Sequence, residues 1–438
     1  MAQALGKRFA QISLPLLLAA TPAAAADFPW HVATHAWNAD SIPPAELRLD
    51  VASYNVQFVT PDLPLLRAFL REFPGHKPNV AARAQAIGEA LACFDVVALQ
   101  ETINDQRRRE IFAAMEAAGR DCGKPSRLPS GRMFTFLSGP GLPETTLPGV
   151  QIDPDTRNLR IVPVLDDELA LATRLPVVEV GELVYGAAAD EDRLAAKGVL
   201  HARLARRSGQ RLYDVVDVFV THLQAGNDEA AIRRRQIEEL AGFIRQHSQG
   251  TTLPLLIMGD FNLDGGEASR RDPSSEYAFL QRSLQQAVAP RKLADLWLAA
   301  NPAASDQAGS TKPGAVIEEL PRIPPRRIDY VFLATLNGDV RPLAARRDFL
   351  PREVVIDGAP VGYLSDHAAV LARLAWPPTP SEMVVAQAGH AGDEGLHPSR
   401  DHSSIAVSPY SRRMNASVNL PFLRSSASAS LPRSLGGP

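Results

Sequence analysis

This sequence of 438 residues has few cysteines and a small net charge. It contains only two cysteines, and its 46 basic and 49 acidic residues leave a formal charge of −3. That balance argues against a strongly basic protein that binds nucleic acid without specificity. It does not exclude a nuclease, because a bound metal ion can supply the positive field locally.

The two cysteines, Cys93 and Cys122, allow two interpretations. In an oxidising compartment they could form a disulfide and close a loop across the segment that carries Glu101. Two unpaired, partly buried thiols are the other open alternative. A zinc site with cysteine ligands is disfavoured, because no histidines join the two cysteines at ligand spacing.

The N-terminal residues have the pattern of a secretory signal peptide. Lys7 and Arg8 give a basic start. Residues 12–20 form a short apolar core, and the alanines at 24–26 offer a cleavage position. The apolar run is too short to span a bilayer. We therefore expect a signal peptide at residues 1–26 and a secreted or periplasmic protein.

Composition divides the rest of the chain in two. After Trp376 the sequence becomes rich in proline and serine and shows no periodic apolar face. We expect a disordered tail without chemistry at 377–438. Residues 27–376 are predicted to form one catalytic domain, whose size suits a single large α/β unit.

Within that domain, short runs rich in β-branched residues alternate with helical patterns. The runs that predict strands are 47–58, 95–99, 212–221, 253–260, 328–333 and 368–374. Apolar residues at helical spacing predict one helix over 80–94 and another over 237–244. The second helix should begin near Asn227 and Asp228, which offer an N-cap.

Short polar motifs lie in or at the ends of these strands, which suggests that one edge of a sheet carries a site. Each motif alone is weak, because an asparagine near a strand end is usually a turn residue and a lone histidine is usually part of the core. Their polar members, in chain order, are Ser53, Asn55, Gln100, Glu101, Thr221, His222, Gln224, Asp260, Asn262, Arg327, Asp329, Ser365, Asp366 and His367.

Taken together, these residues suit the hydrolysis of a phosphodiester. That reaction needs a hard cation on the phosphate oxygens, an activated water and a group that stabilises the leaving oxygen. Mg²⁺ prefers oxygen ligands and takes only one or two carboxylates, and Glu101 with Asn55 can supply such a site. A histidine base needs a carboxylate that fixes its tautomer, and His367 could use Asp329.

Asp260 and Asn262 lie two positions apart in the sequence. Side chains two apart in an extended segment point the same way. We therefore expect this carboxylate and this amide to face one phosphate.

The ordered set of motifs resembles the endonuclease/exonuclease/phosphatase superfamily over about residues 50–375. The resemblance implies an α/β fold, a four-layered α/β sandwich of two packed mixed sheets flanked by helices. It also implies a metal-dependent phosphoric diester hydrolase that uses Mg²⁺, or else Mn²⁺ or Ca²⁺. Glu101, Asn55 and Asp366 would be on the metal side of the site, and Thr311 fits a less diagnostic family position.

The same resemblance implies the catalytic roles. His367 would be the general base for the attacking water, with Asp329 as its orienting partner. Asp260 and Asn262 would position the nucleophile and the phosphate. His222 would stabilise the phosphate or help the leaving group.

Two features resemble the neutral sphingomyelinase branch of the superfamily. Residues 221–225 are similar to that branch's histidine strand, and residues 192–198 are similar to its Asp-x-x-Ala-x-Lys-Gly loop. In that loop an Asp–Lys pair switches the site between forms, so Lys197 would lie near the phosphate and Asp192 would restrain it. The alternative is an ordinary surface ion pair, worth about 0–1 kcal/mol. The family's usual signature before a strand that ends in Ser-Arg-x-Pro is not present at residues 166–176, so the resemblance assigns no phosphate contact to that segment.

We therefore predict an exported, sphingomyelinase-like enzyme that cleaves a phospholipid headgroup phosphodiester with a histidine-activated water and contacts a membrane surface. The alternative is an exported, Mg-dependent endonuclease or exonuclease that acts on DNA. A nuclease should carry basic residues beside its groove, and Arg322, Arg326 and Arg327 provide only a small cluster. A binding protein without catalysis is disfavoured, because all the predicted catalytic residues are present at once. The number of metals and the oligomeric state stay open.

Overall fold

The computed structural model of the protein describes residues 47–59, 80–141, 149–152, 159–162, 168–208, 211–312, 325–336, 340–348, 354–356, 359–361 and 363–376. The predicted signal peptide at 1–26 and the predicted tail at 377–438 lie outside these residues. Among the described residues, no helix combines the length and the apolar character needed to cross a membrane.

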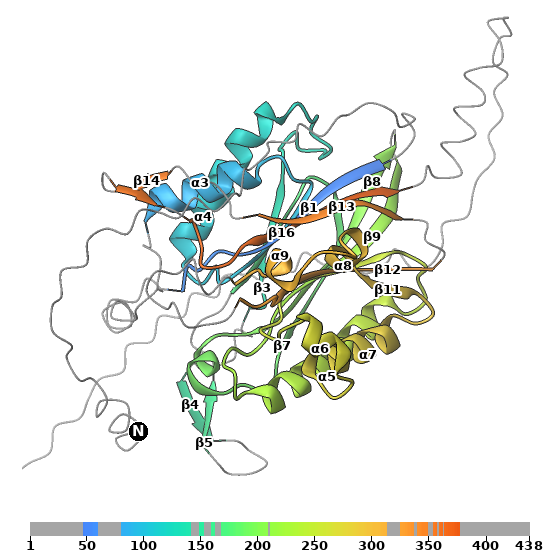
Figure 1. Ribbon diagram of the computed structural model, residues 1–438. Coiled ribbons are helices and arrows are strands. Elements are labelled where there is room, and N and C mark those ends of the chain that lie inside the picture. Colours follow the sequence, from blue (N-terminus) through green and yellow to red (C-terminus); the bar gives the residue numbers. More distant parts are fainter. Residues whose placement is uncertain are drawn as a thin grey trace, which may run out of the picture. The chain divides into compact units, whose positions relative to one another are not determined.

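Two six-stranded mixed sheets form the centre of the fold (Figure 1). The first has the order β13 (Arg341–Asp348), β16 (Ala369–Trp376), β1 (Leu47–Asn55), β2 (Val96–Gln100), β6 (Leu169–Thr173) and β3 (Thr135–Gly139). The second has the order β11 (Lys292–Asp295), β12 (Asp329–Thr335), β10 (Leu255–Asp260), β9 (Arg211–His222), β8 (Gly198–Ser208) and β7 (Val177–Val184). All the strands predicted from the sequence are among them.

The inner faces of the two sheets pack against each other. In β9, Val216, Val218 and Val220 belong to the core cluster shared by both sheets, whereas Phe219 belongs to the cluster beneath the outer helices. This division follows from the geometry of a strand, in which successive side chains point to opposite faces. Strands buried on both faces are apolar almost throughout, as these are.

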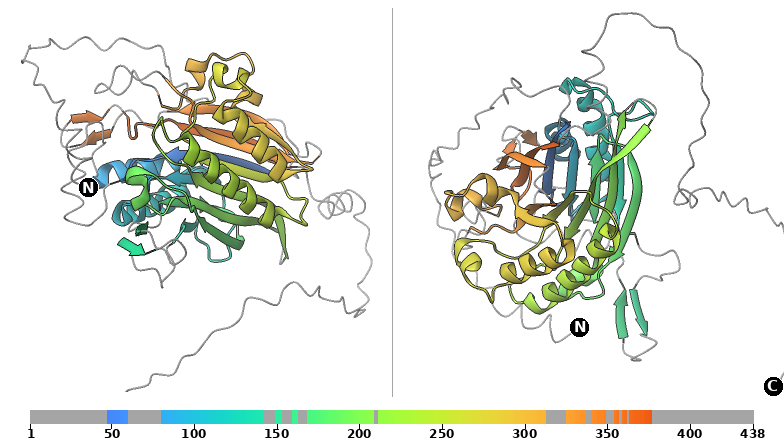
Figure 2. Two further views of the ribbon diagram at one scale, coloured as in Figure 1. Left: turned by 90° about the horizontal axis from the view of Figure 1, so that it is seen from below. Right: turned by 90° about the vertical axis from the view of Figure 1, so that its right-hand side faces the viewer.

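Helices cover the outer face of each sheet (Figure 2). The first sheet is covered by α3 (Ala81–Leu91) and α4 (Asp105–Ala118), and the second by α5 (Ala230–Ser248) and α7 (Glu276–Val288). The layers are therefore helix, sheet, sheet and helix, and the predicted four-layered sandwich is confirmed.

The remaining described elements are short. They are η2 (Gly119–Cys122), η3 (Asp190–Leu194), α6 (Glu267–Arg271), α8 (Leu296–Ala300) and α9 (Asp306–Gly309), and the small sheets β4 (Gly149–Ile152) with β5 (Leu159–Val162) and β14 (Val354–Ile356) with β15 (Ala359–Val361).

The start of α5 differs slightly from the expectation. The helix begins at Ala230, and the preceding Glu229 makes no side-chain capping bond. The expected cap near Asn227 and Asp228 is therefore wrong by one to two positions. The amide oxygen of Asn227 instead accepts a hydrogen bond from Arg326 Nη1 at 2.6 Å.

Cys93 and Cys122 form a disulfide, which decides between the two alternatives left open by the sequence. The first cysteine follows α3, and the second ends η2. The closed loop contains β2, Glu101 and the whole of α4. The bridge therefore ties together the two helices on the outer face of the first sheet.

A cluster of charged side chains links β1 to β16. Arg373 Nε donates to Asp50 Oδ1 at 2.6 Å, and Lys124 Nζ lies 3.0 Å from Asp50 Oδ2. Burial by itself would raise the pKa of Asp50, but the hydrogen bond to Arg373 and the charge of Lys124 lower it below the ordinary value of 3.8.

Asp50→Asn is expected to lower the free energy of unfolding at neutral pH by about 1.5–3 kcal/mol. A carboxyl group whose pKa is depressed by folding stabilises the fold above its unfolded pKa, and this contribution is lost as the pH falls through the folded pKa. The difference between the two proteins should be constant above about pH 5 and shrink below about pH 4. Urea unfolding over that range measures it, and a difference independent of pH would contradict the prediction.

Candidate active site

The predicted site residues meet at one edge of the paired sheets because of strand direction. β1 runs parallel to β2, and β9 runs parallel to β10, so their carboxyl ends lie together. β12 and β16 run antiparallel to these strands and begin at the same edge. The register places Asp260 directly opposite both His222 and Asp329.

The backbone turns sharply where the strands end. Gln57, Glu101 and Asn262 have φ of 51°, 57° and 53°, in the left-handed region that non-glycine residues rarely adopt. Such conformations persist only where the surrounding structure holds them, and they are concentrated at functional sites. The segment carrying Asp260 and Asn262 is therefore not extended, and the expected reason for their shared direction is wrong. They lie together because the chain turns back and the backbone N–H of Asn262 donates to Asp260 Oδ1 at 2.8 Å.

Gly259 allows β9 and β10 to approach each other beside the site. Its φ is 154°, and a Cβ added there would lie 1.9 Å from the carbonyl oxygen of Thr221. Any larger residue would push Asp260 away from His222.

His367 is held by a carboxylate, as predicted. Its Nδ1 lies 2.9 Å from Asp329 Oδ2, and its Nε2 faces the site, 3.7 Å from Asp260 Oδ2. The Thr311 hydroxyl accepts the backbone N–H of Asp329 at 3.1 Å and so fixes the start of β12. Burial would lower the pKa of His367, but Asp329, Asp366 and Asp260 raise it to about 9 against the charge of Lys312.

His222 has a carboxylate partner that the sequence did not reveal. Its Nδ1 is hydrogen-bonded to Glu168 Oε1. Its Nε2 lies 3.1 Å from Lys197 Nζ, 3.0 Å from Asn262 Nδ2 and 3.6 Å from Asp260 Oδ2. Because Lys197 and Asn262 are donors, Nε2 accepts in this arrangement and Nδ1–H donates to Glu168. Burial and the charge of Lys197 would lower the pKa of His222, but Glu168 and Asp260 raise it above its ordinary value.

A single amide joins carboxylates from the two sheets. Asn55 Nδ2 donates to Glu101 Oε1 at 2.9 Å and to Asp260 Oδ2 at 3.0 Å. The amide oxygen of Asn55 accepts the N–H of Gln57 at 3.1 Å, so it is turned away from Glu101. Asn55 therefore positions the two carboxylates here, and its predicted contact with a metal would require the amide to rotate.

These carboxylates fit a divalent cation. Ligand atoms of Glu101, His222 and Asp260 lie within 4.8 Å of one another, and so do those of Asp260, Asp329 and His367. Burial and the nearby Asp366 raise the pKa of Glu101, which is the sign of crowded negative charge. Closely spaced oxygen donors that repel one another are the donor set that Mg²⁺, Mn²⁺ or Ca²⁺ prefers.

The predicted Asp–Lys pair is formed, and it lies beside His222. Lys197 Nζ is 3.1 Å from Asp192 Oδ2, and Asp192 also accepts the N–H of Ala225 at 2.7 Å. The Lys197 side chain is 3% exposed, so this is not an ordinary surface ion pair. Burial would lower the pKa of Lys197, but Asp192, Glu168 and Glu101 raise it, so the ammonium stays charged.

All the residues proposed from the sequence therefore converge on one edge of the fold. They are His367, His222, Asp329, Asp260, Asn262, Glu101, Asn55, Asp366, Lys197 and Asp192.

Sequence reasoning missed two residues of the site, Glu168 and Lys312. Glu168 lies directly before β6, in the segment where the family signature is absent. Lys312 Nζ lies 3.1 Å from Asp366 Oδ2 and 3.3 Å from His367 Nε2. Its position next to Thr311 was the one signal that could have drawn attention to it.

Comparison with known proteins gives a family and several relatives. The sequence pattern of the Endonuclease/Exonuclease/phosphatase family matches residues 52–367. Sphingomyelinase C from Bacillus cereus is 26% identical over 129 residues, which are 28% of this chain and 37% of the relative. The aligned segment thus spans little more than a third of the length of that curated relative.

Solved structures with a similar fold include two bacterial proteins and one from D. rerio. Beta toxin 275-280 from Staphylococcus aureus is 16% identical, with a TM-score of 0.49 over 74% of this chain and 99% of that chain. Sphingomyelinase C from Streptomyces griseocarneus is 20% identical, with a TM-score of 0.46 over 75% and 99%. D. rerio TDP2 complexed with single strand DNA product is 17% identical, with a TM-score of 0.46 over 75% and 98%.

Glu168→Gln should reduce kcat by about 100-fold while KM changes little, because it removes the carboxylate that fixes the tautomer of His222. A positioning role also predicts a shift of the pH profile of kcat, which a loss of packing alone would not produce. Turnover of a soluble phosphodiester between about pH 5 and pH 10 measures both effects. Glu239→Gln, on α5, is the control for the change of charge, and equal activity of the two variants would contradict the assignment.

Proposed function

Because the chain belongs to the endonuclease/exonuclease/phosphatase family, we propose that it is a divalent-metal-dependent phosphodiester hydrolase that acts on sphingomyelin or a related phospholipid. One observation carries the hydrolase proposal. Two histidines, each held by a carboxylate, place their Nε2 atoms 3.6 and 3.7 Å from the same oxygen of Asp260. This arrangement places a base, His367, and a second imidazole, His222, on either side of that carboxylate oxygen.

Glu101, Asp260 and Asp366 are the residues that would hold the cation, and the Asn55 amide positions the first two of them. When bound, Mg²⁺ would neutralise phosphate oxygens among these carboxylates and stabilise the charge that develops during cleavage. Glu101 is only partly buried, so the metal side of the site opens toward solvent.

His367 is the proposed base. Its Nδ1–H donates to Asp329, so Nε2 is the nitrogen that faces the attacking water. A pKa of about 9 leaves Nε2 protonated at neutral pH, and the positive charge of a bound cation would lower that pKa and free the lone pair. Once Nε2 takes the proton, the Asp329 carboxylate stabilises the imidazolium. Lys312, which lies near Nε2 and is about one quarter exposed, is placed to bind a phosphate oxygen instead.

His222 and Lys197 form the opposite wall. The Lys197 ammonium supplies a fixed positive charge, and Asn262 supplies an amide donor next to it. Preorganised donors of this kind stabilise a transition state more than a ground state. His222, which Glu168 holds in place, is the proposed partner of the leaving oxygen once its Nε2 is protonated, a state that its raised pKa favours.

Two observations favour a lipid over DNA. The relative named Sphingomyelinase C shares 26% identity with 129 residues of this chain, and the buried Asp192–Lys197 pair matches the branch-specific loop. The basic cluster expected of a nuclease is weakened, because Arg327 is buried and its Nη1 lies 2.6 Å from Asp295 Oδ2. An arginine in that position does not reach a nucleic-acid backbone.

The substrate is tested with the mature protein in Mg²⁺ against sphingomyelin vesicles, phosphatidylcholine vesicles, plasmid DNA and bis(p-nitrophenyl) phosphate. We expect phosphocholine release from sphingomyelin, abolished by EDTA and restored by Mg²⁺. Cleavage of DNA with intact lipid would replace the lipid proposal by the nuclease alternative. No turnover of any substrate would overturn the hydrolase proposal itself.

His367→Ala is the variant that tests the base in the same assay. Turnover should fall by about 100- to 10,000-fold, and added imidazole should restore part of it because it can occupy the vacated space. Circular dichroism should show an unchanged fold. Substantial turnover without imidazole would mean that the base is another residue.

We also propose that the protein is exported, with residues 1–26 removed. The Cys93–Cys122 disulfide supports this, because disulfides persist mainly in oxidising compartments. Fractionation of the producing cell, with mass spectrometry of the N-terminus, should find a chain beginning at Asp27 in the periplasm or the medium. An intact N-terminus in the cytoplasm would refute export and leave the enzymatic proposal untouched.

A further inference from the structure

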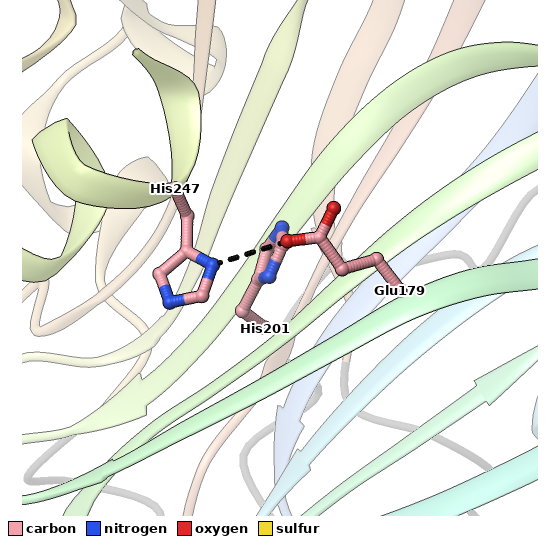
Figure 3. Close-up of side chains that lie close together, drawn as sticks. All are labelled: Glu179, His201 and His247. Carbon is pink, nitrogen blue, oxygen red and sulfur yellow. Dashed lines mark hydrogen bonds and ion pairs between the residues drawn. The ribbon is translucent and has the colours of Figure 1, made fainter. Parts of the chain in front are cut away.

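Three potential metal ligands, Glu179, His201 and His247, form a second cluster (Figure 3). Glu179 belongs to β7, His201 to β8 and His247 to the last turn of α5. His201 pairs with Phe219, which faces the helices, whereas His222 points to the inner side of the same sheet. The cluster and the active site are therefore on opposite faces of one sheet.

The three side chains point toward one another (Figure 3). One ligand atom from each lies within 4.8 Å of the other two. His247 Nδ1 and Glu179 Oε1 are 3.4 Å apart, which is long for a hydrogen bond. Two donors bound to one tetrahedral ion at about 2.0–2.1 Å are separated by about 3.3–3.4 Å. The spacing therefore suits a shared ion better than a direct bond.

The orientation of His201 is the second, independent observation. Its Nε2 lies 2.9 Å from Asp217 Oδ1, which accepts the ring proton. Its Nδ1 is fully buried and has no hydrogen-bond partner within the part of the chain that the structure describes. A buried acceptor without a partner is costly. Histidines that bind a metal through one ring nitrogen commonly donate to a carboxylate from the other. His201 has this orientation, with Nε2 on Asp217 and Nδ1 free.

The backbone leaves room for this cluster. Gly181 lies opposite His201 across the β7–β8 ladder, and a Cβ added at Gly181 would lie 2.6 Å from His247 Cε1. The two imidazole rings have centroids 4.6 Å apart, and Phe219 and Phe243 pack against them. The rings are therefore fixed before any ion arrives.

The local charge also suits a cation. Arg203 bonds Glu179 Oε2 at 2.7 Å and Asp217 Oδ1 at 2.9 Å, so one guanidinium faces two carboxylates. One negative charge is left over, and Glu179 Oε1 remains directed toward His247. Glu179 is 39% exposed, which gives solvent access to the cluster.

We propose that Glu179, His201 and His247 bind a divalent transition-metal ion of the zinc type, with Asp217 as the carboxylate behind His201. Two imidazoles and one carboxylate are ligands that Zn²⁺ favours, whereas Mg²⁺ and Ca²⁺ prefer oxygen. The ion joins the C-terminal end of α5 to β7 and β8, and its role is to fasten this helix to the edge of the sheet. The proposal does not depend on the proposed enzymatic function.

The experiment is a titration of the EDTA-stripped full chain with Zn²⁺, followed by calorimetry and by elemental analysis of the dialysed protein. Titration with Co²⁺ adds a spectroscopic signal for tetrahedral nitrogen ligation. His247→Gln and Glu179→Gln should each remove one equivalent of bound Zn²⁺, with affinity at that site reduced more than about 100-fold. Asp217→Asn should weaken it by about 10- to 100-fold.

Two controls separate this site from the active site and from general effects. Glu182 lies on the opposite, exposed face of β7 from Glu179. The Glu182→Gln protein should therefore bind Zn²⁺ as the unmodified protein does. Glu101→Gln alters the active site and should retain the second binding event. Zn²⁺ should also raise the Tm of the Glu101→Gln protein but not of the same protein carrying His247→Gln. Absence of Zn²⁺ binding, or equal binding by His247→Gln and Glu182→Gln, would overturn the proposal.

Discussion

The amide of Asn55 is the contact on which the active site depends, because it donates to carboxylates that come from different sheets. Glu101 follows a strand of the first sheet, and Asp260 ends a strand of the second. Two carboxylates that share one donor are close enough to repel each other, and the Asn55 amide holds them in place. The sandwich packs the sheets face to face, and this bond aligns the edges at which their functional residues emerge.

The site is stabilised as a set of mutual partners rather than as separate pairs. Asp329 and Glu168 each hold a histidine, Lys197 is held by Asp192, and Lys312 by Asp366. A buried charge is tolerated only when it is paired and hydrogen-bonded. Removing any one member takes a hydrogen bond or an ion pair from its neighbours, so the electrostatics of catalysis and the stability of this edge are coupled.

The second sheet uses its two faces for different chemistry. Its inner face ends at the proposed catalytic histidine, and its outer face carries the histidine cluster beneath α5. Alternation of side chains along β8 and β9 makes this separation possible, since residues one position apart point to opposite sides. A single pair of strands can therefore serve a reactive site and a structural one without contact between them.

The sequence by itself determined the strands that carry the motifs, because apolar periodicity identifies a buried strand and a polar residue at its end stands out. The two packed sheets with their helices and the ten site residues were predicted from the order of these motifs, through the resemblance to the family. The cap of α5 was placed too early because the Asn227 side chain is used by Arg326, a distant partner.

Only the tertiary structure decided the pairing of Cys93 with Cys122, the carboxylate behind His222 and the grouping of Glu179, His201 and His247. Each joins residues from separate elements, and nothing in their local sequence distinguishes them from solvated side chains. Strand register and packing bring these residues together. Glu168, directly before β6, reaches His222 at the end of β9, and Gly181 leaves the space that the His247 ring enters. Such contacts depend on how the strands align, which the spacing of residues along the chain does not specify.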